Sequence, residues 1–102
     1  MDKSPPTISF SGRLDTSRYP EIVQRFVDCP EGDCVVVDLS ETRHVEPTFM
    51  GELLLFNRRM TKEGRTIVIV AKGDVARRLV LAGLDRRIRI VSNRDAAAML
   101  LA

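Results

Sequence analysis

A threonine next to a proline is the position in this sequence that is best suited to chemistry. Thr48 follows Pro47 at the start of a predicted helix, where proline is favoured because its missing N–H would have no helical partner. The other first-turn N–H groups are also unpaired, and the helix dipole is positive at this end. A phosphate on the Thr48 hydroxyl would meet these groups, so Thr48 is suited to be a phosphoacceptor. The alternative is that Thr48 only helps to cap the helix.

Most catalytic and metal-binding patterns are absent from the sequence. It has no glycine-rich phosphate loop, no G-x-S-x-G turn and no H-E-x-x-H motif. The single histidine, His44, has no nucleophile beside it and is interpreted as a loop residue. The two cysteines, Cys29 and Cys34, are too few for a zinc site and are interpreted as reduced thiols near a turn. We therefore expect no enzyme, no metal and no cofactor; a nucleotide hydrolase is the enzymatic alternative.

Length and charge limit the class of protein. The 102 residues, 44% of them apolar, suffice for one hydrophobic core and one domain. Sixteen basic and 14 acidic residues give a net charge of +2, which provides no general attraction to nucleic acid. No apolar stretch reaches membrane-spanning length, and no signal peptide is visible. We expect a cytoplasmic protein that neither inserts into a membrane nor binds nucleic acid directly.

Two periodicities predict the elements that position these residues. Strands are expected where apolar residues alternate or run continuously, and helices where they recur every three or four residues. The expected order is strand 7–14, helix 20–27, strand 35–39, helix 47–63, strand 66–71, helix 75–82, strand 88–91 and helix 95–101. This alternation predicts an α/β fold with about four helices on a mostly parallel sheet of four to five strands. Residues 1–6 are expected to be a flexible lead, and residues 7–102 a single domain.

Four short stretches carry a resemblance to a known family. Residues 45–54 read V-E-P-T-F-M-G-E-L-L and are similar to D-S-S/T-G-L-G-x-L-L, the signature of the STAS family (sulfate transporter and anti-sigma factor antagonist). Residues 11–15, 35–40 and 81–85 resemble the family motifs G-x-L-D, V-x-D-L-S and L-x-G-L-D. The resemblance spans about residues 8–101 and is particularly to the bacterial anti-sigma factor antagonists. It implies a single STAS-like domain.

The resemblance implies a regulatory function with Thr48 as the switch. In that family the second hydroxyl residue of the signature is phosphorylated by the anti-sigma factor, a serine/threonine kinase of the histidine-kinase-like ATPase fold. Unmodified antagonist binds this kinase and frees the sigma factor, whereas phosphorylated antagonist is released. A phosphate adds about −1.5 to −2 charges to a contact that suits a neutral hydroxyl. The alternative is an adaptor subunit that is not phosphorylated and is bound to the ATPase of an ABC lipid transporter.

The residues beside Thr48 depart from the family signature. Glu46 stands where the family has Asp, Pro47 replaces the first Ser, and Phe49 replaces a small Gly. Phe49 is expected either in the core or at the surface as an anchor for a partner. Together with Met50, these residues form the expected surroundings of the phosphoacceptor and the docking face for the partner.

Two residues from other segments are expected on the same surface. Asp15 and Ser40 follow or end predicted strands, on the side where Thr48 should emerge. The alternative is that both only cap a helix or a loop. The sequence leaves open whether the protein forms a homodimer. It also leaves open whether Arg86, Arg87 and Arg89 contact a partner.

Overall fold

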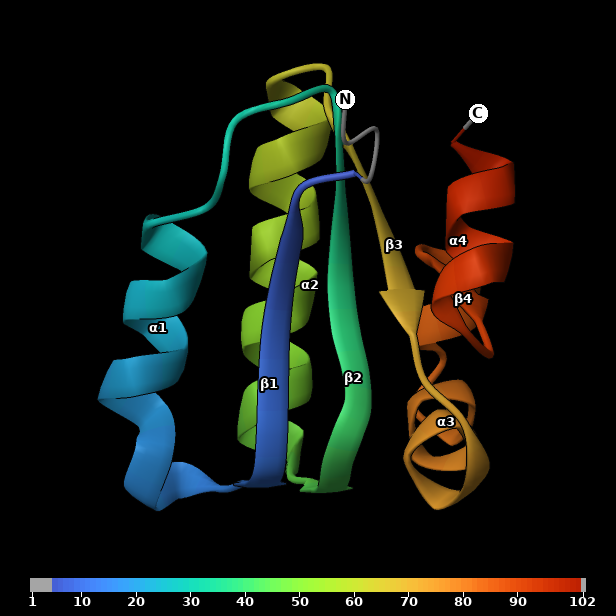
Figure 1. Ribbon diagram of the computed structural model, residues 1–102. Helices are drawn as coiled ribbons and strands as arrows, with labels where there is room; N and C mark the ends of the chain where they lie inside the picture. The colour runs from blue at the N-terminus through green and yellow to red at the C-terminus, as the bar shows by residue number, and fades with distance from the viewer. Residues whose placement is uncertain (1–4, 102) are drawn as a thin grey trace.

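A four-stranded parallel sheet forms the centre of the structure, a computed structural model that describes residues 5–101 (Figure 1). The elements in chain order are β1 (Thr7–Leu14), η1 (Thr16–Arg18), α1 (Tyr19–Val27), β2 (Cys34–Val45), α2 (Pro47–Lys62), β3 (Thr66–Val70), α3 (Gly73–Leu81), η2 (Leu84–Arg86), β4 (Arg89–Val91) and α4 (Arg94–Leu100), where η marks a 3-10 helix. The predicted α/β fold with a parallel sheet is confirmed.

The strands lie in the order of the chain, β1-β2-β3-β4. β1 pairs with β2 along its whole length, from Thr7 opposite Val36 to Leu14 opposite Val45. β3 pairs only with the first half of β2, as far as Asp38. Where β3 ends, α3 packs against β2 instead. The carboxyl end of β2 is therefore flanked by β1 and by a helix.

Helices cover both faces of the sheet, as expected for strands with apolar side chains on both faces. α1 and α2 cover one face and α4 covers the other (Figure 1). The larger core, between the sheet and α1 and α2, contains four phenylalanines, whose contacting rings have centroids 4.6 to 6.1 Å apart: Phe10, Phe26, Phe49 and Phe56. The smaller core, under α4, contains Val36, Val68, Val70 and Ala97.

β2 is longer than the sequence predicted, and it ends at Val45 rather than at residue 39. Its second half is polar from Ser40 to His44 and contains two register shifts against β1. The buried Thr42 hydroxyl donates a 3.1 Å hydrogen bond to the Phe10 carbonyl, which fastens this irregular segment. His44 lies in the strand opposite Arg13, so its interpretation as a loop residue is wrong.

The predicted lead at residues 1–6 lies mostly outside the described residues. Pro6 accepts a 2.9 Å hydrogen bond from the Val36 N–H, and Pro5 accepts one of 3.0 Å from the Thr7 hydroxyl. These two prolines therefore already contact the sheet. None of the described helices is long and apolar enough to cross a membrane.

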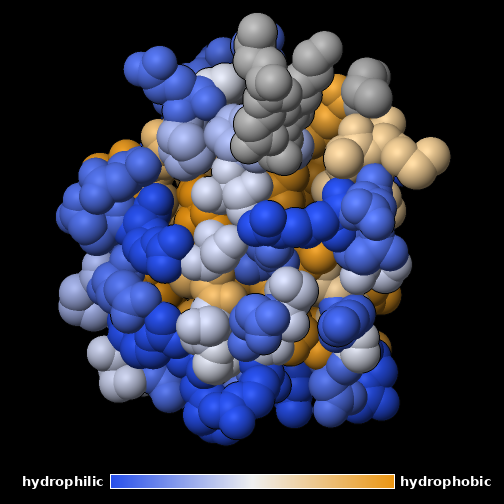
Figure 2. All heavy atoms as spheres, in the orientation of Figure 1, coloured by the Kyte–Doolittle hydropathy of each residue, from blue (hydrophilic) through white to orange (hydrophobic). Residues whose placement is uncertain are grey.

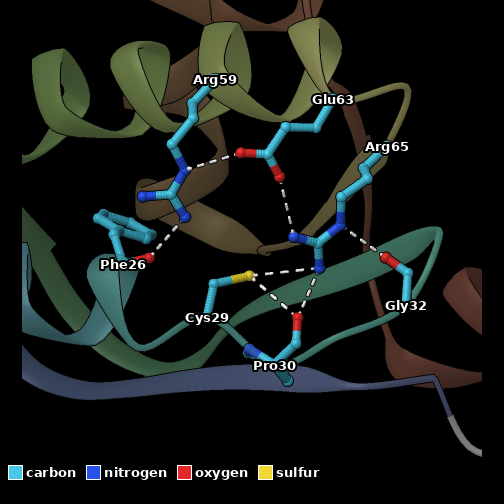
Figure 3. Close-up of polar contacts among 7 residues, drawn as sticks. All are labelled: Phe26, Cys29, Pro30, Gly32, Arg59, Glu63 and Arg65. Atoms are coloured by element: carbon cyan, nitrogen blue, oxygen red, sulfur yellow. Dashed lines mark hydrogen bonds and ion pairs between the residues drawn. The ribbon is translucent and has the colours of Figure 1, made fainter.

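The loop between α1 and β2 is fastened by Arg65 (Figure 3). The Arg65 guanidinium donates to the carbonyls of Gly32, at 2.7 Å, and Pro30, and it lies 3.7 Å from the Cys29 sulfur. It also pairs with Glu63 at 3.3 Å. Both cysteines are free thiols. The cluster joins the start of β3 to this loop and has the character of a structural clamp.

Hydrophilic side chains cover much of the face of the molecule seen in Figure 2, including its lower part. Hydrophilic side chains gather over α1, and apolar side chains gather over α4. On α4, Met99 is 81% exposed and Leu100 is 44% exposed.

Candidate functional site

The carboxyl ends of β1 and β2 bring Asp15 and Glu46 to the same edge of the sheet. Leu14 is paired with Val45, and the Glu46 N–H donates a 3.2 Å hydrogen bond to the Leu14 carbonyl. Residues that follow adjacent parallel strands emerge at one edge. Because α2 begins directly after Glu46, Thr48 lies at this edge as well.

The first turn of α2 keeps free backbone donors. Glu46 is the N-cap residue, with φ −99° and ψ 162°, but its side chain makes no capping hydrogen bond. Its carbonyl accepts the first helical bond, from the Met50 N–H at 3.2 Å. Pro47 has no N–H, so the Thr48 and Phe49 amides are the first-turn donors that lack a helical acceptor. Thr48 lies in the first turn of the helix, and the N-cap residue is Glu46.

Three residues that the sequence patterns did not indicate lie on, or are bonded to, the face of α2 that carries Thr48. Glu52 is one turn further along α2 and accepts a 2.8 Å hydrogen bond from the Tyr19 hydroxyl at the start of α1. This hydrogen bond and the negative charge of Glu52 raise the pKa of Tyr19. Leu55 follows on the same side of α2 and is 59% exposed. The four-residue spacing of Thr48 and Glu52 is visible in the sequence. The contact of Tyr19 with Glu52 is not, because it arises only from the packing of α1 beside α2.

Asp15 lies at the predicted edge and also caps the short helix η1. Its carboxylate accepts hydrogen bonds from the backbone N–H of Ser17, at 3.1 Å, and from the Ser17 hydroxyl. The hydroxyl contact lowers the pKa of Asp15, burial opposes this, and the nearby charges of Arg13 and Arg18 lower it further. Asp15 therefore stays ionised and adds negative charge to the edge.

Ser40 does not lie at this edge. The sequence predicts that Ser40 lies at the end of a strand, but the strand continues to Val45. The remaining residues of β2 separate it from that end by about 16 Å, since a strand advances roughly 3.3 Å per residue. The Ser40 N–H instead donates a 2.9 Å hydrogen bond to Asp38. The structure thus brings Asp15, but not Ser40, to the edge that holds Thr48.

Asp38 forms a second polar cluster, on the face covered by α4. Its carboxylate is 2.6 Å from the Arg94 guanidinium, which also donates to the Ser9 hydroxyl at 3.3 Å. Burial, the largest single influence, raises the pKa of Asp38, but the hydrogen bonds from Ser40 and Arg94 outweigh it and leave the pKa below its usual value. Because Arg94 begins α4, this pair fastens α4 to the sheet.

The family of the protein follows from a comparison over almost the whole chain. The family model described as "Mlab, STAS domain" matches residues 1–92. The chain belongs to the STAS domain family. No curated protein sequence matches the chain.

Solved structures of other STAS proteins share the fold. An anti-sigma factor antagonist from Mycobacterium paratuberculosis is 25% identical, with a TM-score of 0.83 over 98% of this chain and 87% of that one. A sulfate transporter family protein from Wolinella succinogenes is 16% identical, with a TM-score of 0.80 over 98% and 88%. The STAS domain of a SulP transporter from Vibrio cholerae is 15% identical, with a TM-score of 0.73 over 99% and 84%. The last two likenesses concern the fold alone.

Phe49, the largest departure of this STAS domain from the family signature, is buried in the hydrophobic core. The Phe49 side chain is 1% exposed and meets the Phe10 ring edge to face, with centroids 5.3 Å apart. Of the two expectations for Phe49, the surface anchor is therefore wrong. Met50 is half-buried and packs against the same core. On the surface this leaves Pro47, which is exposed, and Thr48 and Glu46, which are half-buried.

The site has no grouping that would hold a metal. Within residues 5–101, no three His, Cys, Asp or Glu side chains gather closely enough to bind a metal ion. The edge and the adjoining face of α2 offer a hydroxyl, free amide donors, several carboxylates and an exposed leucine. Such a surface is suited to binding a protein and to modification at the hydroxyl.

Proposed function

We propose that this STAS domain is a cytoplasmic anti-sigma factor antagonist, a partner-switching regulator that is controlled by phosphorylation of Thr48. The observation that carries the proposal is the likeness to an anti-sigma factor antagonist over 98% of the chain, together with Thr48 in the first turn of α2. The partner is the cognate anti-sigma factor, a serine/threonine kinase of the histidine-kinase-like ATPase fold. The domain itself acts by binding and not as an enzyme.

The charges around Thr48 support a switch. In the unmodified protein, Thr48 and the exposed Leu55 give α2 a docking face with an uncharged hydroxyl and an apolar side chain, beside the carboxylate of Glu52. A phosphate adds about −1.5 to −2 charges at neutral pH. In the free protein, the first-turn amides and the helix dipole can accommodate that charge. In the complex the charge would have to lose water beside Glu52 and Glu46, which is unfavourable and releases the partner.

A capture experiment tests the switch. Wild-type protein, Thr48→Glu and Thr66→Glu serve as baits in lysate of the source organism, with mass spectrometry as the readout. Thr66 is an exposed threonine at the opposite end of the sheet, so Thr66→Glu is the matched control. We expect a kinase-like anti-sigma factor on the wild-type and Thr66→Glu baits and its loss from Thr48→Glu. Equal capture by all three baits would contradict the proposal.

A phosphorylation assay tests the chemistry separately. The captured kinase is incubated with Mg-ATP and either wild-type or Thr48→Ala protein. We expect the wild type to gain one phosphate, located at residue 48 by fragmentation, and Thr48→Ala to gain none. Phosphate at another residue would still support the kinase as the partner, but it would refute Thr48 as the switch.

A second candidate function is that of an adaptor bound to the ATPase of an ABC lipid transporter. The observation that favours it is the departure of Pro47 and Phe49 from the phosphorylated signature. An adaptor needs the docking face of α2 but no phosphate on Thr48. An ABC ATPase held equally by wild type and Thr48→Glu, with unmodified Thr48 in cells, would establish this function in place of the first.

A further inference from the structure

A basic groove lies along the outer side of α2, on the part of the helix that follows Thr48. It has a volume of about 770 Å³ and runs between α2 and the turn that contains η2. Its lining includes two leucines and four cationic residues: Leu54, Leu55, Arg58, Lys62, Arg86 and Arg87. Residues from two distant segments therefore build one concave surface, which we call the basic groove.

The cationic side chains of the basic groove form no ion pair within residues 5–101. All four cationic side chains belong to exposed residues. The ion pairs among residues 5–101 use other arginines: Arg18, Arg59, Arg65, Arg77 and Arg94. No carboxylate is among the residues that line the groove. Cations that converge on an apolar surface without a partner are suited to a ligand that brings its own negative charge.

We propose that the basic groove binds an acidic, amphipathic segment of a partner protein. Charge complementarity requires acidic side chains in the partner segment, and these would pair with the arginines and the lysine on the two walls of the groove. The leucines of the groove require apolar side chains in the partner segment. Leu55 is 59% exposed, and apolar side chains of the partner would cover it on binding. A segment with carboxylates flanking a few apolar residues satisfies both requirements.

Other anionic ligands fit the basic groove less well. Single-stranded nucleic acid is usually held by aromatic side chains that stack on the bases, and no aromatic residue lines the groove. A flat anionic membrane is bound best by cations and apolar side chains that project, whereas these line a hollow. A peptide segment is the ligand whose shape and charge both match.

The basic groove shares Leu55 with the docking face proposed above but is separate from the switch residue Thr48. Thr48 does not line the basic groove, although Gly51, one helical turn later, does. The two surfaces thus meet at Leu55 on α2, and one partner could cover both. The proposal does not depend on phosphorylation, because the charges of the groove are present in the unmodified protein.

The test uses fluorescence anisotropy with a defined probe. The probe is a fluorescein-labelled peptide in which glutamates flank leucines spaced four residues apart, and its counterpart carries lysine in place of glutamate. The double variant Arg86→Glu/Arg87→Glu is compared with Arg78→Glu/Arg89→Glu, which makes the same charge change at exposed arginines outside the groove. Thermal unfolding of both variants verifies that they are folded.

We expect the acidic peptide to bind wild type and the lysine peptide not to bind. Reversal of Arg86 and Arg87 should weaken binding by about tenfold or more, and the control pair should weaken it by less than about threefold. Added salt should weaken wild-type binding, since it screens exposed charges. An equal loss in both double variants would overturn the proposal, because it would show a general charge effect.

Two further arms separate this proposal from its rivals and from the switch. Vesicles containing phosphatidylglycerol and a single-stranded DNA oligonucleotide are tested with the same variants. If vesicles or DNA bind through Arg86 and Arg87 and the peptide does not bind, the proposal that the ligand is a protein segment is wrong. Thr48→Glu should bind the peptide within about twofold of wild type. If Thr48→Glu binds the peptide in this way, the two proposals can fail independently. A Thr48 that proves not to be a switch would not refute peptide binding in the basic groove, and a groove that does not bind the peptide would not refute the switch.

Discussion

The Tyr19 hydroxyl donates a 2.8 Å hydrogen bond to the Glu52 carboxylate, and this bond joins the start of α1 to the second turn of α2. Glu52 is four residues after Thr48, so the two side chains are neighbours on one helix face. Any negative charge placed on Thr48 would face a carboxylate that Tyr19 holds in position.

The first prediction concerns the coupling of Thr48 to Glu52. Thr48→Glu should gain about 0.5 kcal/mol from the helix dipole and lose about as much by repulsion from Glu52. We therefore expect almost no change in the free energy of unfolding. In a Glu52→Gln background, which keeps an acceptor for Tyr19, the gain should appear. Denaturant unfolding of the four proteins of this double-mutant cycle measures the coupling free energy. Thr48→Gln is the uncharged control. If Thr48→Gln is coupled to Glu52→Gln as strongly as Thr48→Glu is, the cause of the coupling is not electrostatic.

The second prediction concerns Phe49, which replaces the small residue of the family signature. Because its ring is buried against Phe10 and Phe26, Phe49→Ala should lower the free energy of unfolding by about 3–5 kcal/mol. Leu55→Ala, on the exposed side of the same helix, should change it by less than about 0.5 kcal/mol. Chemical denaturation measures both. A small effect of Phe49→Ala would place the ring outside the core.

The third prediction is a pH dependence set by Asp38. Its pKa is lowered in the folded protein, so its contribution to stability is complete above the unfolded pKa of about 3.9. That contribution is lost as the pH falls through the lower folded pKa. Asp38→Asn should cost about 2 kcal/mol at neutral pH and flatten the fall in stability on acidification. Thermal unfolding from pH 7 to about pH 2 measures this, because the loss occurs below the unfolded pKa of about 3.9; an unchanged slope in Asp38→Asn would assign the acid sensitivity to other groups.

The fourth prediction concerns Arg65, whose side chain is 18% exposed and holds the loop that leads into β2. Arg65→Met keeps much of the side-chain volume but removes the hydrogen bonds to Pro30 and Gly32. It should cost about 2 kcal/mol and speed hydrogen exchange in residues 29–34. Arg77→Met is the control, because the Arg77–Asp74 pair is 70% and 72% exposed and should contribute less than about 0.5 kcal/mol. Equal effects of the two substitutions would refute the clamp.

Much of the fold follows from local patterns in the sequence. β1 is found where alternation predicted it, and α2 begins at Pro47 as the proline indicated. The continuous apolar run at 35–37 correctly indicated a strand covered on both faces. Local patterns succeed here because the period of apolar residues directly reports which side chains share a buried face.

The sequence by itself determined the order of the elements and placed Thr48 in the first turn of a helix, because periodicity and proline act within a few residues along the chain. Only the tertiary structure decided that β2 continues past Leu39, that Phe49 is buried, that Tyr19 meets Glu52, and that Arg86 and Arg87 face α2. The physical reason is that each of these depends on the register of paired strands or on packing between segments distant in the chain. Such contacts leave no period in the sequence.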